Sequence, residues 1–488
     1  MRITIEFTPH KSTIVTDLSQ DDKFLLYEFL AYQTEGYWFS PKFQSGIWDG
    51  FSRLFNTNHQ SFASGLTAHV VSFLEGQGHE VEITGYPVPR PFSSRLIDTG
   101  KPLREYQIEC ASTICDKRFG IIRIPPRGGK TLIAAAVLSS EAAYPSVFFC
   151  RSIDLANQAR SVFQKSISNV SVGLVGDGVC EIGDITIITI QSAFNAFNKT
   201  LEEKRGKEEA EVPQKSLVRD VIRNAKIVFY DEFHHAGAKT STFILAKCQK
   251  TTMMVGLSAT PFTGTSEDIV VEGICGPVLY DVSYSYLIKH GYLLRPYVTM
   301  CKLPKIEVEG NYQSVYKQAV VDNEYLNQVV KRLVDDLTRQ NLSVVIQTEF
   351  KTHSKKLGKL LNAPVLLGDD STEVREREKQ RLASKENLCL VSTLYEEGVD
   401  LPELDYTINL AGNISDITTL QRMRSMTVSD GKTSCGVIDF IHSCKYLSRH
   451  SRARKACYEA EPEFVVTVIK ADKILEKGFT HEDASISG

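Results

Sequence analysis

The stretch GIIRIPPRGGKTLIAAAVLSSEAA, residues 120–143, decides the fold of this chain. A β-branched apolar run is followed by a turn rich in proline and glycine, and then by a run with the composition of a helix. Gly129 lets the backbone approach an anion closely, and the N-terminus of the following helix favours negative charge. Lys130 can reach the β- and γ-phosphates of a nucleotide, while the Thr131 hydroxyl can ligate Mg²⁺. The stretch therefore predicts a phosphate-binding loop between a strand and a helix.

The match to the phosphate-loop pattern G-x-x-x-x-G-K-[ST] is incomplete, because Ile124 stands at the first glycine. Gly128 and Gly129 still allow close approach of the backbone. Arg127 stands where such loops often have glycine, and it either touches phosphate or is solvated. A chance GGKT turn is the alternative interpretation of this segment taken alone.

A second stretch, KIVFYDEFHH at residues 226–235, weakens that alternative. It indicates a buried strand that ends in Asp231 and Glu232, and a carboxylate at a strand end beside a phosphate loop is placed to hold Mg²⁺. We expect Asp231 to hold the metal through water and Glu232 to polarise the attacking water. His234 is placed to sense the γ-phosphate or a neighbouring motif. Alternatively, His234 and His235 could be ligands of a metal ion, although the sequence suggests no third ligand nearby.

Length and composition indicate a protein of several domains. The chain has 488 residues, 42% hydrophobic and 24% charged, so each of about three domains can bury a core. The formal net charge of −3 argues against a protein that coats nucleic acid through overall charge, and restricts any such site to a local patch. The 11 cysteines form no C-x-x-C pair, and the sequence shows neither a secretory signal nor a run of 18 apolar residues. We therefore expect a reduced, cytoplasmic protein without structural metal.

Apolar runs separated by helical stretches predict two parallel sheets. The first series is GIIRI, SVFFC, ITIITI, KIVFYDE and MMVGLSAT, and the second is SVVIQTEF, APVLLG, LCLVST, YTINLAG and SCGVIDF. The N-terminal part has short alternating runs and an aromatic-rich segment, and it ends in the proline-rich linker YPVPRPF. We expect an α/β protein with a small α+β accessory domain at 1–95, parallel-sheet domains at 96–285 and 286–445, and a C-terminal tail at 446–488.

The motifs, taken in order, resemble those of superfamily 2 helicases of the DExH type. Gly129-Lys130-Thr131, Asp231-Glu232-Phe233-His234 and Ser258-Ala259-Thr260-Pro261 are similar to motifs I, II and III of that family. The resemblance implies two RecA-like domains and the hydrolysis of ATP with Mg²⁺.

Further matches, of which the one at residues 391–408 is close, imply more site residues. In the first parallel-sheet domain they are Gln107 with Arg104 in an adenine-recognising element, and Arg151, Gln191 and Ser192 as nucleic-acid contacts. In the second they are Thr393 as a contact to the nucleic-acid backbone, and Glu397, Gly398 and Asp400 in a loop that faces the nucleotide.

The last motif departs from the family pattern Q-x-x-G-R-x-x-R, because this chain has LQRMRSMT at residues 420–427. With one glycine deleted, Gln421 and Arg424 align with the pattern, and Thr427 stands where the last arginine should be. The resemblance implies that Arg424, or Arg422 as its alternative, is the arginine finger, a group whose loss costs roughly 10³–10⁵ in rate. We expect ATP hydrolysis, and this motif leaves its rate open.

A finer resemblance is to the UvsW-like DNA helicases of bacteriophages. It rests on the forms DEFHH and SATPF, and on the leader FSPKFQSGIWDGFSRLF, residues 39–55, followed by FASGL. The leader is similar to a small N-terminal DNA-binding domain, which implies Lys42, Trp48 and Arg53 as contacts. Packing in a small hydrophobic core is the alternative, and for the tryptophans the favoured, interpretation. The basic run KYLSRHSRARK, residues 445–455, is compatible with a DNA-backbone contact or a solvated helix face.

The resemblance implies a helicase or translocase that unwinds or branch-migrates forks and Holliday junctions, moving 3′ to 5′. Its partner is DNA, with replication or recombination proteins as further candidates. An RNA-stimulated DExH ATPase is the first alternative. A nucleic-acid-binding module with weak hydrolysis is the second, kept open by the altered last motif. The motor part of a restriction enzyme is less favoured, because no nuclease signature of the PD-(D/E)xK type stands out in this sequence.

Overall fold

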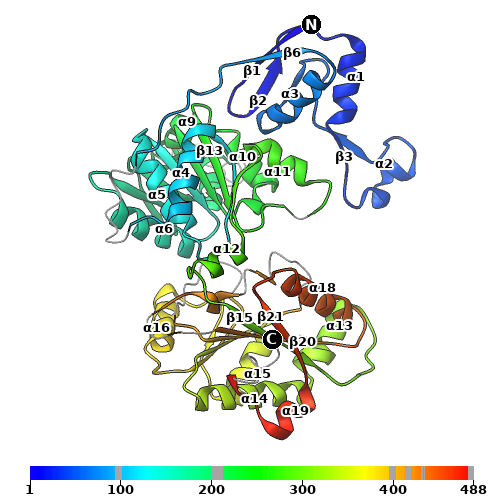
Figure 1. Ribbon diagram of the computed structural model, residues 1–488, viewed down its shortest axis with the longest axis vertical. Coiled ribbons are helices and arrows are strands. Elements are labelled where there is room, and N and C mark those ends of the chain that lie inside the picture. Colours follow the sequence, from blue (N-terminus) through cyan, green and yellow to red (C-terminus); the bar gives the residue numbers. More distant parts are fainter. Residues whose placement is uncertain are drawn as a thin grey trace, which may run out of the picture. The chain divides into compact units, whose positions relative to one another are not determined.

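In the computed structural model, the apolar runs pair into two large sheets, a four-stranded sheet and a two-stranded ribbon (Figure 1). The structure describes residues 1–93, 102–198, 213–262, 264–394, 403–412, 419–420, 423–429, 432 and 435–481. The chain divides into two units, one of Met1–Pro125 and Gly129–Asp281, the other of Pro126–Gly128 and Val282–Gly488. Each unit holds one of the large sheets.

Alternation of apolar and polar residues builds the four-stranded sheet near the N-terminus. In RITIE, Ile3 and Ile5 are fully buried while the flanking residues Arg2 and Glu6 are exposed. The strand order is β5-β2-β1-β6, with β1 antiparallel to β2 and parallel to β6. The strands are β1 Arg2–Glu6, β2 Lys11–Ile14, β5 Ser61–Ala63 and β6 Glu80–Thr84, and the helices are α1 Gln20–Phe29 and α3 Thr67–Gly76, with the 3₁₀ turn η2 Ser64–Leu66 before α3.

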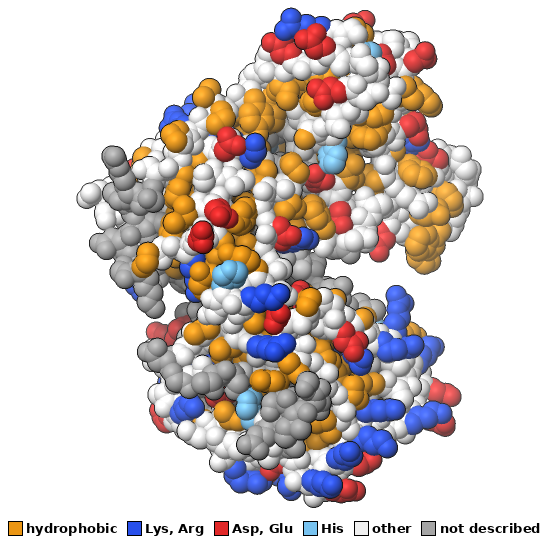
Figure 2. Space-filling model, in the orientation of Figure 1, with side chains coloured by type: hydrophobic (Ala, Val, Ile, Leu, Met, Phe, Trp, Pro, Cys, Tyr) orange, Lys and Arg blue, Asp and Glu red, His pale blue; other side chains and the backbone are white. Residues whose placement is uncertain are grey.

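An arm leaves this small domain between β3 Ala31–Gln33 and β4 Phe51–Arg53, which pair only with each other. It carries the 3₁₀ turn η1 Tyr37–Phe39 and the short helix α2 Pro41–Gln44. Trp38 is 51% exposed and Phe39 76% exposed. Hydrophobic side chains are accordingly visible on this part of the surface (Figure 2). The expectation that both tryptophans pack in a core is therefore wrong for Trp38.

Hydrogen bonds and ring packing attach the small domain to the first parallel-sheet domain. The His10 ring lies 2.7 Å from the carbonyl oxygen of Cys248, and Phe7 packs edge-on against Phe119. A Cβ placed on Gly65 would lie 2.0 Å from the carbonyl oxygen of Glu272, so only glycine allows this approach. The expected linker shares in the attachment, because the Val88 carbonyl accepts a hydrogen bond from an arginine of the parallel-sheet domain.

The first large sheet has the order β10-β9-β11-β8-β12-β13-β7-β14 and is parallel except for β10. Its strands are β7 Phe119–Arg123, β8 Ser146–Cys150, β9 Val172–Gly176, β10 Val179–Glu181, β11 Ile185–Thr189, β12 Ile227–Asp231, β13 Met253–Ser258 and β14 Val278–Asp281. Its helices are α4 Glu105–Lys117, α5 Lys130–Glu141, α6 Ile153–Ser166, α7 Ile190–Phe197, α9 Pro213–Asn224, α10 Lys239–Leu245 and α11 Asp268–Cys275. Strands β8, β11, β12 and β13 are buried at every position, because helices cover the sheet on both sides.

The second large sheet is wholly parallel, in the order β17-β18-β16-β19-β20-β15-β21. Its strands are β15 Pro296–Lys302, β16 Val344–Gln347, β17 Val365–Leu366, β18 Cys389–Ser392, β19 Tyr406–Asn409, β20 Cys435–Ile441 and β21 Val465–Lys470. Its helices are α12 Tyr284–Lys289, α13 Tyr312–Tyr316, α14 Glu324–Arg339, α15 Lys351–Leu361, α16 Thr372–Ala383, α18 Leu447–Glu459 and α19 Ala471–Lys477, with the π-helix η4 Lys317–Val321 and the 3₁₀ turn η5 Arg424–Met426. The predicted fold class, two parallel-sheet α/β domains behind a small α+β domain, is confirmed.

The C-terminal residues differ from expectation. Strand β21 pairs in parallel with β15, and α19 packs on α14. The segment expected to be a tail at 446–488 is thus an integral part of the second sheet domain as far as residue 481. The other expected domain boundaries stay predictions. None of the helices within the described residues is both long and apolar enough to cross a membrane.

One buried histidine gives the second unit a pH-dependent stability. His353 is fully buried, with Nε2 3.3 Å from the Asn327 carboxamide oxygen, and burial lowers the pKa of His353 from 6.5 to about 4. Between about pH 6.5 and 4 this histidine is therefore protonated in the unfolded chain but neutral in the folded chain. Its contribution to the stability of the folded state falls over that range and is lost near pH 4.

We predict that the free energy of unfolding declines between pH 6.5 and 4, with His353 contributing on the order of 3 kcal/mol. His353→Gln removes this part of the slope, whereas replacing the exposed His59 in the same way leaves it unchanged. Urea unfolding at several pH values measures the slopes. Equal slopes for wild type and His353→Gln would contradict the assignment.

Candidate functional site

The phosphate loop joins β7 to α5, as the sequence predicts. Gly129 is the N-cap residue of α5 and has a φ of 79°, in the left-handed region that glycine tolerates. Arg127 also has a positive φ, 69°. Lys130 is 9% exposed, and its ammonium donates to the Ile124 carbonyl at 3.2 Å. The lysine side chain thus folds back over the loop that a phosphate would enter, while Thr131 is the second residue of the helix.

Gln107 reaches the same loop from α4. Its Oε1 accepts a hydrogen bond from the backbone N–H of Arg104 at 3.0 Å, which caps α4 and turns Nε2 away from that helix end. A Cβ placed on Gly129 would lie 2.4 Å from this Nε2. The residue predicted to recognise adenine therefore touches the predicted phosphate loop, although the two are more than 20 positions apart in sequence.

The two carboxylates stand at the carboxyl end of β12. Asp231 ends the strand and is 8% exposed, and its Oδ1 accepts the backbone N–H of Glu232 at 3.1 Å. Glu232 adopts the left-handed conformation, with φ 53° and ψ 55°. Such a conformation costs a non-glycine residue of order 1–3 kcal/mol and marks a position where side-chain direction matters. Because of this backbone conformation, the Glu232 side chain points in a different direction from that of a residue in a regular strand.

A chain of contacts leads from Glu232 to the next strand. His234 Nδ1 lies 3.5 Å from the Glu232 carboxylate and 3.3 Å from the Ser258 hydroxyl at the end of β13. The Ser258 hydroxyl in turn accepts the backbone N–H of Thr260 at 3.2 Å. Strands β12 and β13 are neighbours in the sheet, which brings these groups together. His234 therefore couples the carboxylate segment to the Ser258–Pro261 segment.

The three residues predicted to contact nucleic acid in the first parallel-sheet domain all have hydrogen-bond partners within it. Exposed Arg151 lies beside His235, with Nη1 2.7 Å from Nε2 of the ring. Ser192 sits in the first turn of α7, where Thr189 caps its backbone N–H at 3.3 Å. Gln191 is exposed beside it, and its Nε2 donates to the Asn195 carboxamide oxygen at 3.0 Å. Among the described residues, no group of three or more histidine, cysteine, aspartate or glutamate side chains could hold a metal ion.

The predicted contacts in the N-terminal arm have structural partners. The Trp48 indole N–H donates to the Phe51 carbonyl at 2.7 Å, and Arg53 forms ion pairs with Asp49 at 2.7 Å and Glu28 at 3.0 Å. These bonds hold the arm closed at its base. Lys42 alone of the three predicted contacts has an exposed side chain.

In the second unit only part of the predicted site is described. Thr393 follows β18, and its backbone N–H donates to the Leu366 carbonyl at 3.3 Å. Gly398, Asp400 and Gln421 lie outside the described residues. The backbone of Arg424 opens the turn η5, but its side chain also lies outside them. Their roles stay predictions.

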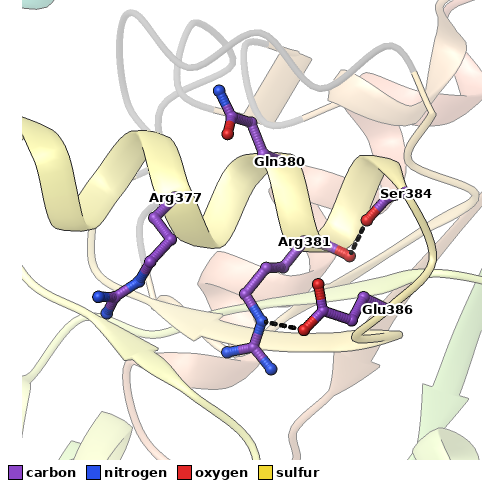
Figure 3. Close-up of a pocket in the computed structure, with 5 residues that line it drawn as sticks. All are labelled: Arg377, Gln380, Arg381, Ser384 and Glu386. Carbon is purple, nitrogen blue, oxygen red and sulfur yellow. Dashed lines mark hydrogen bonds and ion pairs between the residues drawn. The ribbon is translucent and has the colours of Figure 1, made fainter.

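An open hollow of about 630 Å³ lies along α16, and sequence reasoning gave no sign of it (Figure 3). Its lining residues are Arg377, Gln380, Arg381, Ser384 and Glu386. Arg381 is bonded to Glu386 at 3.0 Å, so its charge is largely compensated. The hollow contains none of the predicted site residues.

Two family models match the sequence. Residues 100–263 match the family described as type III restriction enzyme, res subunit, and residues 3–84 match the family described as DNA helicase UvsW, N-terminal. The first match spans the phosphate loop, both carboxylates and Ser258–Pro261. The second spans the small N-terminal domain with its arm.

Known proteins match most of this chain at low sequence identity. A putative helicase of a Sulfolobus islandicus filamentous virus is 24% identical over 75% of this chain and 69% of its own length. The ATP-dependent DNA helicase uvsW of Enterobacteria phage T4 is 20% identical over 88% and 89%. The solved structure of Dbp5 from S. cerevisiae, bound to RNA and ADP BeF3, is 15% identical over 78% of this chain and 92% of that one, with a TM-score of 0.54. That likeness concerns the fold, two RecA-like domains.

The contact between Gly129 and Gln107 yields a test with a matched control. Gly178 has the same φ of 79°, but a Cβ there would meet nothing within 4 Å. Alanine at either position costs about 1 kcal/mol in backbone strain. We predict that both variants lower the melting temperature, Gly129→Ala by more because its Cβ must displace Gln107, and that only Gly129→Ala weakens ATP binding, by at least tenfold.

Titration with a fluorescent ATP analogue and a thermal melt of each variant make the comparison. Equal ATP affinity in the two variants would show that the Gln107 contact does not shape the nucleotide site.

Proposed function

We propose, since this chain is a UvsW-like, ATP-dependent helicase of superfamily 2, that it is a motor that unwinds or branch-migrates branched DNA. Forks and Holliday junctions arising in bacteriophage replication, recombination or repair are its substrates in this proposal. Replication and recombination proteins are candidate partners, and movement is expected from 3′ to 5′.

One observation carries this proposal beyond a generic helicase. The small N-terminal domain, which matches the UvsW family, is bonded to the segment that follows Ser258–Pro261. The backbone N–H of Glu35 donates to the Glu267 carboxylate at 3.0 Å, and the Ser266 hydroxyl donates to the Gln33 carbonyl. Glu35 and Gln33 lie at the base of the arm. A change at the carboxylates can thus be transmitted through His234 and Ser258 to a domain that the family uses on DNA.

The site residues then have distinct roles in ATP hydrolysis. Lys130 neutralises the β- and γ-phosphates, which enter against the backbone of Gly128 and Gly129. Gln107 and Arg104 recognise the adenine. Glu232 orients and polarises the attacking water, which its turned-out carboxylate favours.

Magnesium fits the oxygen donors at this site. The Thr131 hydroxyl and the Asp231 carboxylate are hard oxygen ligands of the kind that Mg²⁺ prefers, and Asp231 is held in place by its bond to the following N–H. When bound, the metal would neutralise developing charge on the phosphates. Gln421 and Arg424 are proposed to stabilise the same charge, with Gly398 and Asp400 in a loop facing the nucleotide.

Contacts to DNA are proposed at phosphates rather than bases, as expected for a motor that works on any sequence. Arg151, Gln191 and Ser192 serve in the first sheet domain and Thr393 in the second. In the arm, exposed Lys42 is proposed to contact phosphate directly. Trp48 and Arg53 stabilise the folded arm and so support its contact with DNA. The altered last motif favours a second candidate function, a DNA-binding module with weak hydrolysis.

The test compares ATP hydrolysis by wild type and Glu232→Gln without nucleic acid and with RNA, single-stranded DNA, duplex DNA and a four-way DNA junction. We predict the largest stimulation by branched DNA, and a fall of at least 100-fold in Glu232→Gln because the general base is lost. Removal of Mg²⁺ by EDTA abolishes hydrolysis. Glu75→Gln, on the exposed end of α3, is the matched control and retains full activity.

The remaining outcomes separate the alternatives. Stimulation by RNA alone assigns the chain to RNA-dependent ATPases. Binding of junctions by wild type without hydrolysis on any nucleic acid supports the binding module and overturns the motor.

A further inference from the structure

Helix α18 has two faces of opposite character. Its buried residues, which recur at spacings of three and four, are Leu447, Ser451, Arg454, Cys457 and Tyr458. On the opposite face Arg449 and Arg452 are exposed one turn apart, and Lys445, two residues before the helix, is also exposed. An apolar stripe opposite mixed charges is the usual pattern of a surface helix. Glu459, at the end of the helix, is also exposed and pairs with Lys455, so the cations without such a partner lie at the start of α18.

The cations at the start of α18 have few carboxylates near them in the described part of the chain. From Lys445 to Lys455 the sequence contains five lysine or arginine residues and no carboxylate. Among the residues that the structure describes, no carboxylate forms an ion pair with Lys445, Arg449 or Arg452. On α14, by contrast, Lys331, Arg332 and Arg339 are paired with aspartates of the same helix, at 2.8–2.9 Å. Figure 2 shows Lys and Arg side chains gathered on the side of this unit where Figure 1 places α18.

A buried ion pair fixes the helix in place. Arg454 donates through Nε and Nη2 to the two carboxylate oxygens of Asp439 on β20, both at 2.8 Å. The same carboxylate accepts from the Tyr458 hydroxyl at 3.1 Å and from the Asn409 amide at 3.0 Å. Burial alone would raise the pKa of Asp439, but the guanidinium and these donors lower it below its usual range. A carboxylate with all its partners in place holds α18 rigidly on the sheet.

The position of the helix places its cations at the predicted nucleic-acid edge of the second sheet. Because the strands are parallel, the ends of β18, β19 and β20 lie at one edge. Thr393 follows β18, Gly412 follows β19, and Lys445 follows β20. His450 of α18 also binds the Gly412 carbonyl, with Nδ1 2.5 Å from it. The start of α18 is thus continuous with the edge that carries Thr393.

We propose that Lys445, Arg449 and Arg452 form a phosphate contact on the exposed face of α18, which follows the DNA backbone along this edge. The inference rests on the proposed DNA motor and adds a contact surface outside its motifs. Cations about one helix turn apart, on long side chains, suit successive phosphates of one strand, and they read no base. The pair of Asp439 and Arg454 acts as the positioning device.

The experiment measures duplex DNA binding by fluorescence anisotropy between 50 and 300 mM salt. Each lost phosphate contact lowers the slope of log affinity against log salt by about 0.9. We expect the triple variant Lys445→Gln, Arg449→Gln, Arg452→Gln to lose about 2–3 of that slope and at least tenfold in affinity near 150 mM salt. In DNA-stimulated ATP hydrolysis, the DNA concentration for half-stimulation rises at least tenfold while the rate at saturating DNA is unchanged.

A matched triple, Lys470→Gln, Lys473→Gln, Lys477→Gln, removes the same charge from and beside α19, which packs on α14. Its slope stays that of the wild type. A wild-type slope in the α18 triple overturns the inference and assigns the basic face to another partner, such as an acidic protein surface. An equal loss in both triples also overturns it, because overall charge would then be the cause. Failure of the wild type to bind DNA at all is a different result, and it overturns the proposed function itself.

Discussion

Parallel strand pairing is the constraint on which both sheet domains depend. It sends every strand's carboxyl end to one edge of the sheet, so segments far apart in sequence meet there. In the first sheet, β12 and β7 both flank β13, which gathers Asp231, Ser258 and the phosphate loop at a single edge. In the second sheet the same rule aligns Thr393, Gly412 and the start of α18. If one central strand were reversed or lost, the residues of the site at that edge would no longer lie close together.

Backbone conformation at that edge is specialised rather than regular. Gly129 and Glu232 both adopt left-handed conformations, one beside Gln107 and the other beside His234. The first allows close approach of a phosphate, and the second redirects a carboxylate. The buried strand before Glu232 and the contact with His234 stabilise its strained backbone conformation. Nucleotide chemistry and the link to Ser258 thus depend on the same few residues.

The buried centres of the sheets could be predicted from sequence, because strands covered on both faces leave uninterrupted apolar runs such as ITIIT and IVFYD. The edge strand β21 and its neighbour β15 could not be predicted. Strand β21 has exposed positions such as Val468 within it, and β15 begins with proline, so neither stands out as an apolar run. The predicted C-terminal tail was wrong for this reason. The phosphate loop and its carboxylates were recognisable from local pattern, but the contacts of Gln107 with Gly129 and of His234 with Ser258 depend on strand order. The sequence marks Trp48 and Arg53 as candidate DNA contacts. Only the folded structure shows that both form hydrogen bonds or ion pairs within the arm and at its base.

The central claim is that one edge of the first sheet binds ATP with Mg²⁺ between the phosphate loop and Asp231. The most direct measurement is a crystal structure of the chain with Mg²⁺ and a non-hydrolysable ATP analogue. We predict phosphates against the backbone of Gly128 and Gly129, the Lys130 ammonium turned from the Ile124 carbonyl to the phosphates, and the metal between Thr131 and Asp231. A nucleotide bound elsewhere, or a loop that keeps Lys130 on Ile124 with the analogue at saturation, would contradict the account.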